Sequence, residues 1–250
     1  MVDLAAVHSR LGRQLTEAMS KVAMSGRYIR GAEVNMLEGE LAMYAGSRHA
    51  LTCANGTEAI QIALMALGLK PGDEVITPSF SFISAAEVAK LLGLKVVFAD
   101  IDPDTFNIDP RSAESLITPR TRAIIPVHLF GRMAPMEPLL ALARRHGLAV
   151  VEDGAQAFGA EQQVDGRRRK ACSVGTIGCT SFFPTKNLGC MGDGGAVFTD
   201  DDALAARMAE IAAHGAKRKY HSEVVGLNSR LDEIQAAVLR VKLRHLDEYI

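Results

Sequence analysis

The sequence predicts an α/β fold in which a mostly parallel sheet is sandwiched by helices. Seven short apolar runs rich in β-branched residues alternate with helical patterns along most of the 250 residues. Strands that are covered by helices on both faces read as apolar runs, so this pattern favours a parallel sheet. With 48% hydrophobic residues, the chain can bury a full core, as one large or two small domains.

The expected strands and helices follow one another in alternating order. Strands are expected at 49–54, 74–79, 95–101, 122–129, 148–155, 176–183 and 195–200. Helices are expected between most of them, at 57–68, 81–92, 111–117 and 135–146, with another at 201–213. No helical pattern separates 176–183 from 195–200, so part of the sheet is expected to run antiparallel.

Both ends of the chain are expected to be helical. Residues 2–24 and 33–45 read as two helices split by the turn "SGRYIRG". Residues 230–250 carry an amphipathic pattern that reaches Ile250 without a glycine, asparagine or proline stop signal. We interpret this segment as the start of a long helix, in a chain cut before its natural end.

Charge and cysteine content argue against several classes of protein. A net charge of −1 is not that of a general nucleic-acid or anionic-membrane binder, and the first residues lack the apolar core of a signal peptide. Four cysteines without a C-x-x-C pair are expected to be reduced thiols of a cytoplasmic protein. The run "RRRK" at 167–170 follows an Asp165-Gly166 turn and is interpreted as a solvated loop rather than a nucleotide contact.

The stretch "TCANGTEAIQIAL" contains a possible anion site. A strand ends at Ala54, Asn55-Gly56 makes a turn, and Thr57 begins a helix. Free N–H groups at a helix start, approached closely over a glycine, suit a phosphate group. Plain helix capping by Asn55 is the alternative interpretation.

The stretch "VVEDGAQAFGA" places Glu152 and Asp153 at the carboxyl end of an apolar strand. Ligands of open parallel sheets bind at this edge. An acid there could cap the next turn, bind a metal or pair with a cationic ligand. Metal binding would need more partners, and His128 at the end of the preceding strand is the obvious one.

The stretch "SFFPTKNLGCMGDGG" carries one lysine, Lys186, after a strand that ends near Ser181. Phe182, Phe183 and Pro184 are expected to shield this lysine from water, which favours its neutral and nucleophilic form. The glycines that follow let the backbone turn tightly. Taken alone, a surface loop lysine would be the simpler interpretation.

Together the three stretches match the needs of one cofactor. Pyridoxal phosphate requires donors for its phosphate, an acid for its pyridine nitrogen and an amine for its aldehyde. An aromatic face usually covers the ring, and "PSFSFISAA" offers Phe80 or Phe82 for that position.

The same motifs carry a resemblance to a known family. "NGTEA", "PSFSFIS", "VHLFG", "EDGAQAFGA", "SFFPTKNLGCMGDGG" and "GLNSRLDEIQAA", in this order, are similar to the DegT/DnrJ/EryC1/StrS sugar aminotransferases. The resemblance covers essentially the whole chain and implies the large domain of the fold-type I pyridoxal phosphate enzymes. It implies that residues 1–250 form this domain, with N-terminal helices over about residues 1–45, and that a small C-terminal domain is absent.

The resemblance assigns a role to each motif residue. It makes Lys186 the Schiff-base lysine, Asp153 the partner of the pyridine nitrogen, Phe82 the residue stacked on the ring and Gln156 a contact near the cofactor's 3-hydroxyl. The implied phosphate ligands are Gly56, Thr57 and Ser181, with Asn228 reaching the phosphate of a neighbouring subunit. Arg230, together with Tyr220 in the basic segment 214–221, is expected near the sugar nucleotide, and a solvated loop is the alternative for both.

The implied reaction moves an amino group from L-glutamate to a keto sugar nucleotide in a homodimer. The motifs most resemble the branch that aminates a 3-keto UDP-N-acetylglucosaminuronic acid for O-antigen synthesis.

One alternative is a dehydratase of the same fold, which Lys186 disfavours because those forms carry histidine there. Another is a truncated chain that binds the cofactor without completing the reaction. A nicotinamide-binding domain is disfavoured because no G-x-G-x-x-G follows a strand.

Overall fold

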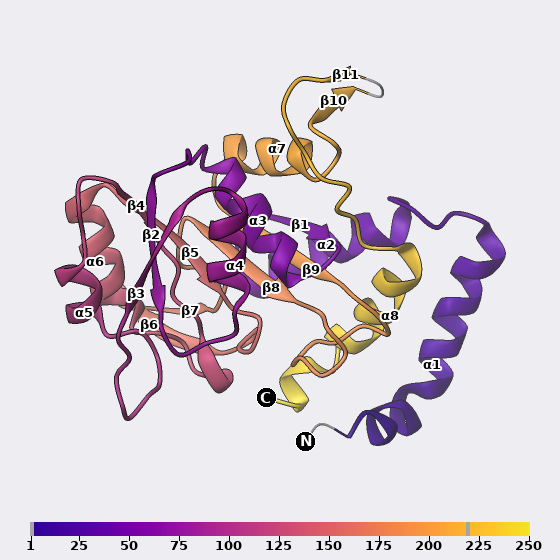
Figure 1. Ribbon diagram of the computed structural model, residues 1–250. Helices are drawn as coiled ribbons and strands as arrows, with labels where there is room; N and C mark the ends of the chain where they lie inside the picture. The colour runs from indigo at the N-terminus through magenta and orange to yellow at the C-terminus, as the bar shows by residue number, and fades with distance from the viewer. Residues whose placement is uncertain (1–2, 219–220) are drawn as a thin grey trace.

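The computed structural model describes residues 3–218 and 221–250 of the chain. Its centre is a seven-stranded sheet with the strand order β1-β9-β8-β5-β4-β2-β3 (Figure 1). The strands are β1 (His49–Cys53), β2 (Glu74–Pro78), β3 (Lys95–Ala99), β4 (Thr121–Ile124), β5 (Ala149–Asp153), β8 (Ile177–Ser181) and β9 (Gly195–Thr199). All seven expected strands are therefore confirmed.

The strand directions also follow the expectation. Five strands form a parallel series, in the order β3, β2, β4, β5 and β8. Strand β9 runs antiparallel to both of its neighbours, β8 and β1. The segment between β8 and β9 has no helix, as the sequence indicated, and the chain simply turns back into the sheet.

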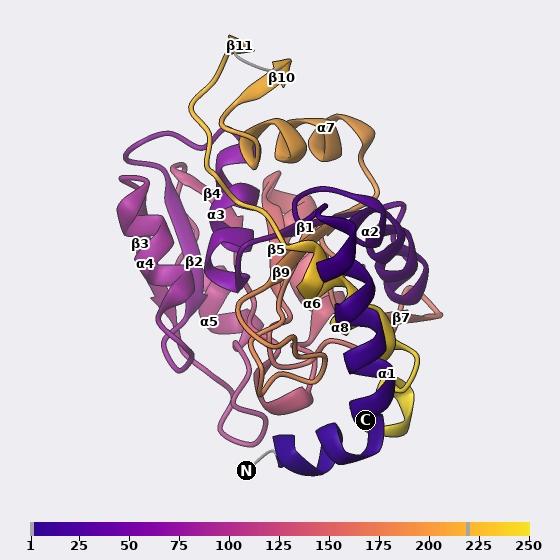
Figure 2. The ribbon, with the colours of Figure 1, turned by 90° about the vertical axis from the view of Figure 1, so that its right-hand side faces the viewer.

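Helices cover both faces of the sheet because successive residues of a strand point to opposite sides. In β5, Val150 packs into one core and Val151 into the other. The first core includes α2 (Ala32–Ala45), α5 (Pro110–Ser115), α6 (Met136–His146) and α8 (Glu233–Leu243). The second includes α3 (Gly56–Ala66), α4 (Ser84–Leu91) and α7 (Asp202–Ile211). Figure 2 shows α3 and α4 on one side of the sheet and α2 and α8 on the other.

The N-terminal helix α1 (Leu4–Ser25) lies against α8 (Figure 2). Leu11 and Leu15 of α1 are buried against Val238 and Val241 of α8. The expected long helix over 230–250 is wrong, because α8 ends at Leu243. There the N–H of His245 bonds to the carbonyl of Lys242 at 3.0 Å, and the chain tightens into a 3-10 turn, η2 (Leu246–Glu248).

Two short hairpins were not expected. The basic run "RRRK" is not a loop but strand β7 (Arg167–Lys170), paired antiparallel with β6 (Glu161–Val164). Asp165 (φ 49°) and Gly166 (φ 71°) both adopt left-handed backbone, which is the geometry of a tight hairpin turn. Glu161 forms ion pairs with Arg168 and Lys170 across the hairpin. The second hairpin joins β10 (Ala216–Arg218) to β11 (His221–Ser222).

Across the part of the chain that the structure describes, no helix is both long enough and apolar enough to cross a membrane.

Candidate functional site

The segments that carry the expected site residues all meet at one edge of the sheet. β2, β5 and β8 run in the same direction, so their carboxyl ends lie at one edge of the sheet, and β9, which runs opposite to its neighbours β8 and β1, starts at that edge. In the register, Gly195 at the start of β9 pairs with Ser181 at the end of β8 and with Cys53 at the end of β1. The loops that follow β1, β2, β5 and β8 therefore open on the same side.

The turn after β1 forms a closed cradle at the start of α3. The Asn55 side chain accepts the N–H of Glu58 at 2.8 Å, and its carbonyl accepts the N–H of Ala59. Among the hydrogen bonds of the described residues, none is donated by the amides of Gly56 and Thr57, as is usual for the first turn of a helix. The capping interpretation is thus confirmed, and it leaves two amides available for an anion.

Close packing restricts what can occupy this cradle. A Cβ atom on Gly56 would lie 2.6 Å from the Cβ of Ser181, which is shorter than any normal contact. A Cβ on Gly195 would lie 2.5 Å from the carbonyl carbon of Asn55. Glycine is therefore required at both positions, and it brings Ser181 against the first turn of α3.

Asp153 ends β5 with its carboxyl group buried. Its Oδ1 accepts the N–H of Ala155 at 3.1 Å, which is a turn cap of the kind considered from the sequence. Burial raises the pKa of this carboxyl, and the N–H of Ala155, followed by His128 and Lys186, opposes that rise.

Lys186 lies half-buried in a loop that folds back on itself between β8 and β9. Its own N–H bonds to the carbonyl of Phe183 at 2.8 Å, and a Cβ on Gly189 would lie 2.4 Å from the carbonyl oxygen of Pro184. The glycine is therefore needed for the tight turn, as the sequence indicated. A hydrogen bond from α8 holds this loop in place: the Lys242 ammonium donates to the carbonyl of Gly189 at 2.6 Å.

The expected aromatic shield around Lys186 is only partly present. Phe182 is fully buried in the core, where its ring packs edge-on against Phe158 at 6.3 Å between centroids. Phe183 is 49% exposed. Side chains alternate sides at the end of a strand, so the first of these residues joins the core and only the second stays near the surface.

Phe82 and Gln156 lie in the neighbouring loops. Phe82 precedes α4 and is 67% exposed, which leaves its ring open to a ligand. Gln156 follows β5 and its Oε1 accepts the N–H of Phe130 at 3.1 Å. Phe130, with φ 54°, adopts left-handed backbone that bulky residues rarely take.

Three exposed phenylalanines form a cluster at this edge that sequence reasoning did not identify as a group. We call Phe80, Phe106 and Phe130 the aromatic triad; their ring centroids are 5.7 to 6.4 Å apart. Phe106, like Phe130, has positive φ, at 59°. Strained backbone of this kind is concentrated at functional sites in proteins.

The segment around Asn228 reaches the cradle through a residue that the sequence did not single out. The buried hydroxyl of Ser229 accepts the N–H of Ala54 at 3.1 Å, just before the cradle turn. Its neighbours Asn228 and Arg230 are exposed on either side. Tyr220 lies outside the described residues.

Unlike its neighbour Asp153, Glu152 is hydrogen-bonded to a buried histidine. Glu152 and His128 are both fully buried, and His128 Nε2 lies 2.9 Å from Glu152 Oε2. Backbone N–H groups of the 172–175 loop also donate to this carboxylate. The metal interpretation finds no support, because within residues 3–218 and 221–250 no group of three or more His, Cys, Asp or Glu is placed to hold a metal ion.

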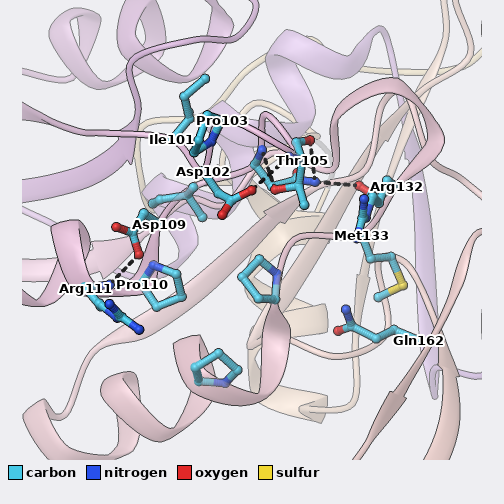
Figure 3. Close-up of a pocket in the computed structure, with 14 residues that line it drawn as sticks. Ile101, Asp102, Pro103, Thr105, Asp109, Pro110, Arg111, Arg132, Met133 and Gln162 are labelled. Atoms are coloured by element: carbon cyan, nitrogen blue, oxygen red, sulfur yellow. Dashed lines mark hydrogen bonds between the residues drawn. The ribbon is translucent and has the colours of Figure 1, made fainter.

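A cavity of about 580 Å³ lies along the loop between β3 and α5 (Figure 3). Asp102, Thr105 and Asp109 line it from that loop, and Met133 and Gln162 from other segments. None of the residues expected to bind the cofactor lines this cavity. A separate cavity of about 280 Å³ lies beside Lys186 and Lys242, below α1.

Several known proteins of similar sequence and structure are described as aminotransferases. Residues 9–250 match the sequence model of the family described as the "DegT/DnrJ/EryC1/StrS aminotransferase family". A UDP-2-acetamido-2-deoxy-3-oxo-D-glucuronate aminotransferase of Pseudomonas aeruginosa is 49% identical over 249 residues, which are 100% of this chain and 68% of that protein.

Solved structures agree with the sequence comparison. A DegT DnrJ EryC1 StrS aminotransferase from Brucella abortus superposes with a TM-score of 0.94 at 43% identity, over 99% of this chain and 67% of that one. The protein ntda from Bacillus subtilis, solved with bound cofactor PMP, superposes with a TM-score of 0.88 at 33% identity, over 94% of this chain and 53% of that one. The chain thus spans between about half and two thirds of the length of these relatives. Because the family match covers nearly the whole chain and the fold agrees, the chain belongs to the DegT/DnrJ/EryC1/StrS aminotransferase family.

Proposed function

We propose that this chain is the cofactor-binding part of a pyridoxal phosphate aminotransferase that moves the amino group of L-glutamate to a keto sugar nucleotide. The observation that carries the proposal is the gathering of three groups at one sheet edge. These are the free amides at the start of α3, the buried carboxyl of Asp153 and the amine of Lys186.

The residues present fit pyridoxal phosphate. The cradle, formed by Gly56, Thr57 and Ser181, offers two unpaired amides and hydroxyl groups to a phosphate. Asp153 is a buried carboxyl whose one side-chain hydrogen bond comes from Ala155, so a cationic ring nitrogen would complete its partners. Lys186 is half-buried on the loop that follows Ser181 at the end of β8, at the same edge of the sheet as this acid.

The chain's own residues then divide the work. When bound, pyridoxal phosphate supplies an aldehyde for amines and a protonated ring that withdraws electrons from the reacting carbon. Lys186 would supply the amine that holds the cofactor, and the same amine could move a proton at the reacting carbon. Asp153 would keep the ring nitrogen protonated, Phe82 would cover the ring face and Gln156 would contact its oxygen side.

For the substrate, we propose a 3-keto UDP-N-acetylglucosaminuronic acid used in O-antigen and other surface polysaccharide synthesis. Support comes from the 49% identity to the Pseudomonas aeruginosa enzyme, whose name describes that substrate. Arg230 is exposed beside the Asn228 segment and would offer a guanidinium to a sugar carboxylate or a phosphate. We assign Tyr220 to the same substrate region.

For the partner, we propose a second copy of the chain. The aromatic triad, together with Phe82 and Phe183, leaves large apolar rings exposed in the loops at the site's edge. Exposed apolar patches usually mark contacts with another protein or a ligand. In a dimer, Asn228 would reach the cofactor phosphate of the neighbouring subunit.

The visible absorption spectrum tests the proposal. The purified chain with pyridoxal phosphate is expected to show the yellow band of lysine-bound cofactor, and L-glutamate is expected to bleach it. Lys186→Ala should abolish the band. Lys21→Ala, which changes an exposed lysine of α1, should leave it unchanged and serves as the control.

The same spectrum distinguishes the alternative of a cofactor-binding chain without turnover. A band that requires Lys186 but ignores glutamate would support that alternative. If no band forms in the unmodified chain, the cofactor assignment itself is wrong.

A further inference from the structure

The fully buried side chain of His128 has hydrogen bonds to two separate segments. His128 Nδ1 accepts the backbone N–H of Ala134 at 3.0 Å. A ring nitrogen that accepts an N–H carries no proton, so the proton of the neutral ring is on Nε2. That nitrogen lies 2.9 Å from Glu152 Oε2 and donates to it.

Glu152, which accepts the hydrogen bond from His128 Nε2, is itself held by several backbone N–H groups. Its Oε1 accepts the N–H groups of Val174 and Gly175, each at 2.7 Å, and its Oε2 accepts that of Cys172 at 3.1 Å. With His128 it therefore has four N–H donors and no exposed surface. A buried carboxylate with this many donors is held firmly in one orientation.

The backbone of His128 also bonds to β5, at Asp153, which is the residue after Glu152. Its N–H donates to the carbonyl of Asp153 at 2.9 Å, and the N–H of Asp153 donates to the carbonyl of Pro126 at 2.9 Å. His128 thus holds both Glu152, through its ring, and Asp153, through its main chain. Successive side chains of a strand point to opposite faces, so Asp153 faces away from the side chain of Glu152.

The bond to Ala134 closes a loop that contains Phe130. This loop, residues 128–134, starts at the His128 main chain and returns to the His128 ring, so both of its ends are fixed by one residue. Within it, Phe130 is held at φ 54° and donates its N–H to Gln156 Oε1 at 3.1 Å. Strained backbone persists only where its surroundings determine it, and the His128 ring provides that constraint.

We propose that His128 is a positioning residue for the cofactor: through Glu152 and Ala134 it fixes the carboxyl end of β5 and the 128–134 loop, and so sets the places of Asp153 and Gln156. This inference rests on the proposed function, because those two residues are assigned there to the pyridine nitrogen and to the oxygen side of the ring. Neutral imidazole suits the task because it offers an acceptor and a donor at opposite corners of one rigid ring.

Two variants test the proposal against a matched control. His128→Phe keeps a ring but removes both hydrogen bonds. Glu152→Gln keeps the shape but turns an amide donor toward the Nε2–H, or loses the loop N–H groups if it flips. Thr199→Val, at the end of β9 and so at the opposite edge of the sheet, removes a comparable buried hydrogen bond, from the hydroxyl to the carbonyl of Thr176 at 2.9 Å.

The readouts are the dissociation constant for pyridoxal phosphate and the induced circular dichroism of the bound cofactor in the visible range. Both His128→Phe and Glu152→Gln are expected to bind the cofactor about 10- to 100-fold more weakly, the loss usual for residues that orient direct ligands, and to reduce the dichroism. Thr199→Val is expected to lower the melting temperature while leaving both readouts unchanged. Affinity and dichroism equal to the unmodified chain in the two site variants would overturn the proposal.

A measurement on the unmodified chain keeps the test decisive if a variant fails to fold. In a ¹⁵N NMR spectrum of the histidine rings, His128 is expected as the tautomer with its proton on Nε2, both with and without cofactor. A proton on Nδ1 would overturn the proposal. Normal cofactor binding by the unmodified chain together with a failure of these tests would leave the proposed function standing, whereas absence of binding in the unmodified chain would remove both.

Discussion

The carboxylate of Glu233, at the start of α8, accepts the backbone N–H of Gly31, just before α2, at 2.7 Å. Its two oxygens also accept the N–H groups of Glu33 at 2.9 Å and Val34 at 3.0 Å. The first turn of α2 has no side-chain cap of its own, so a residue about 200 positions away supplies it. A Cβ on Gly31 would lie 2.7 Å from Glu233 Oε2, which explains the glycine.

Replacement of this distant cap is expected to destabilise the fold. Glu233→Ala leaves partly buried N–H groups without acceptors, so the free energy of unfolding should fall by about 2–4 kcal/mol. Urea denaturation followed by far-UV circular dichroism would measure the loss. Glu17→Ala, which breaks an exposed ion pair with Arg13, is the control and should cost less than about 0.5 kcal/mol. Equal losses for the two variants would show that the cap is unimportant.

A methyl group on Gly56 is expected to impair cofactor binding. Because its Cβ would meet Ser181 at 2.6 Å, Gly56→Ala must push the start of α3 away from the end of β8. We expect a loss of about 1–3 kcal/mol in stability and at least tenfold in affinity for pyridoxal phosphate, by equilibrium dialysis.

The control for this variant lies in α1. A Cβ on Gly12 would have no neighbouring heavy atom within 4 Å, so Gly12→Ala should stabilise the chain by about 0.5–1 kcal/mol without changing the affinity. Unchanged affinity in Gly56→Ala would argue that the phosphate binds elsewhere.

Asp153→Asn is expected to separate cofactor binding from reactivity. The amide keeps the size and the hydrogen-bond acceptor but has no charge to hold a proton on the ring nitrogen. The rate at which glutamate bleaches the visible band should therefore fall by about 10²- to 10³-fold in stopped-flow experiments. Asp104→Asn, in an exposed turn, should react at the normal rate. A normal rate in Asp153→Asn would contradict the assigned role.

The acid stability of the chain is expected to depend on Glu74, which is fully buried at the start of β2. A hydrogen bond from Thr118, with others from Lys95 and Arg120, lowers the pKa of this carboxyl from 4.5 to about 2, against the effect of burial. Since the pKa is lower in the folded state, the stabilisation is complete above about pH 4.5 and is lost as the pH falls toward 2.

Unfolding measured between pH 2 and 7 tests this dependence. The stability difference between the unmodified chain and Glu74→Gln should be constant near neutral pH and should shrink below about pH 4.5. Thr118→Val removes the leading hydrogen bond and should reduce the same pH dependence. A difference that stays constant down to pH 2 would show that Glu74 does not titrate in this way.

The strand and helix pattern was predictable because it depends on local apolar periodicity, which the long-range contacts then reinforce. The β6–β7 hairpin was missed because its strands are polar and are held by cross-strand pairs such as Glu161–Arg168, which no periodicity reveals. Its Asp165-Gly166 turn was nevertheless a hairpin signal in the sequence. The end of α8 at Leu243 was missed because neither glycine nor proline marks it.

The site residues likewise include some that were predictable from the sequence and some that were not. Motif spacing and the family resemblance were enough to name Asp153, Lys186 and the cradle residues, which the topology brings to one edge. The positions of Phe182 in the core and of His128 between two segments depend on contacts that are distant in sequence. Such contacts leave no local pattern, so only the three-dimensional structure reveals them.

The pairing of β1 with β9 has a consequence for how the protein forms during synthesis. The cradle after β1 is completed by Gly195 and Ser181, which leave the ribosome long after Gly56. At about 5–20 residues per second, β1 is made roughly 7–30 seconds before its partner β9, whereas β8 is made only about 1–3 seconds before it. An unpaired apolar strand edge tends to pair with another chain, so we expect the nascent protein to be most prone to association with other chains before β9 is made.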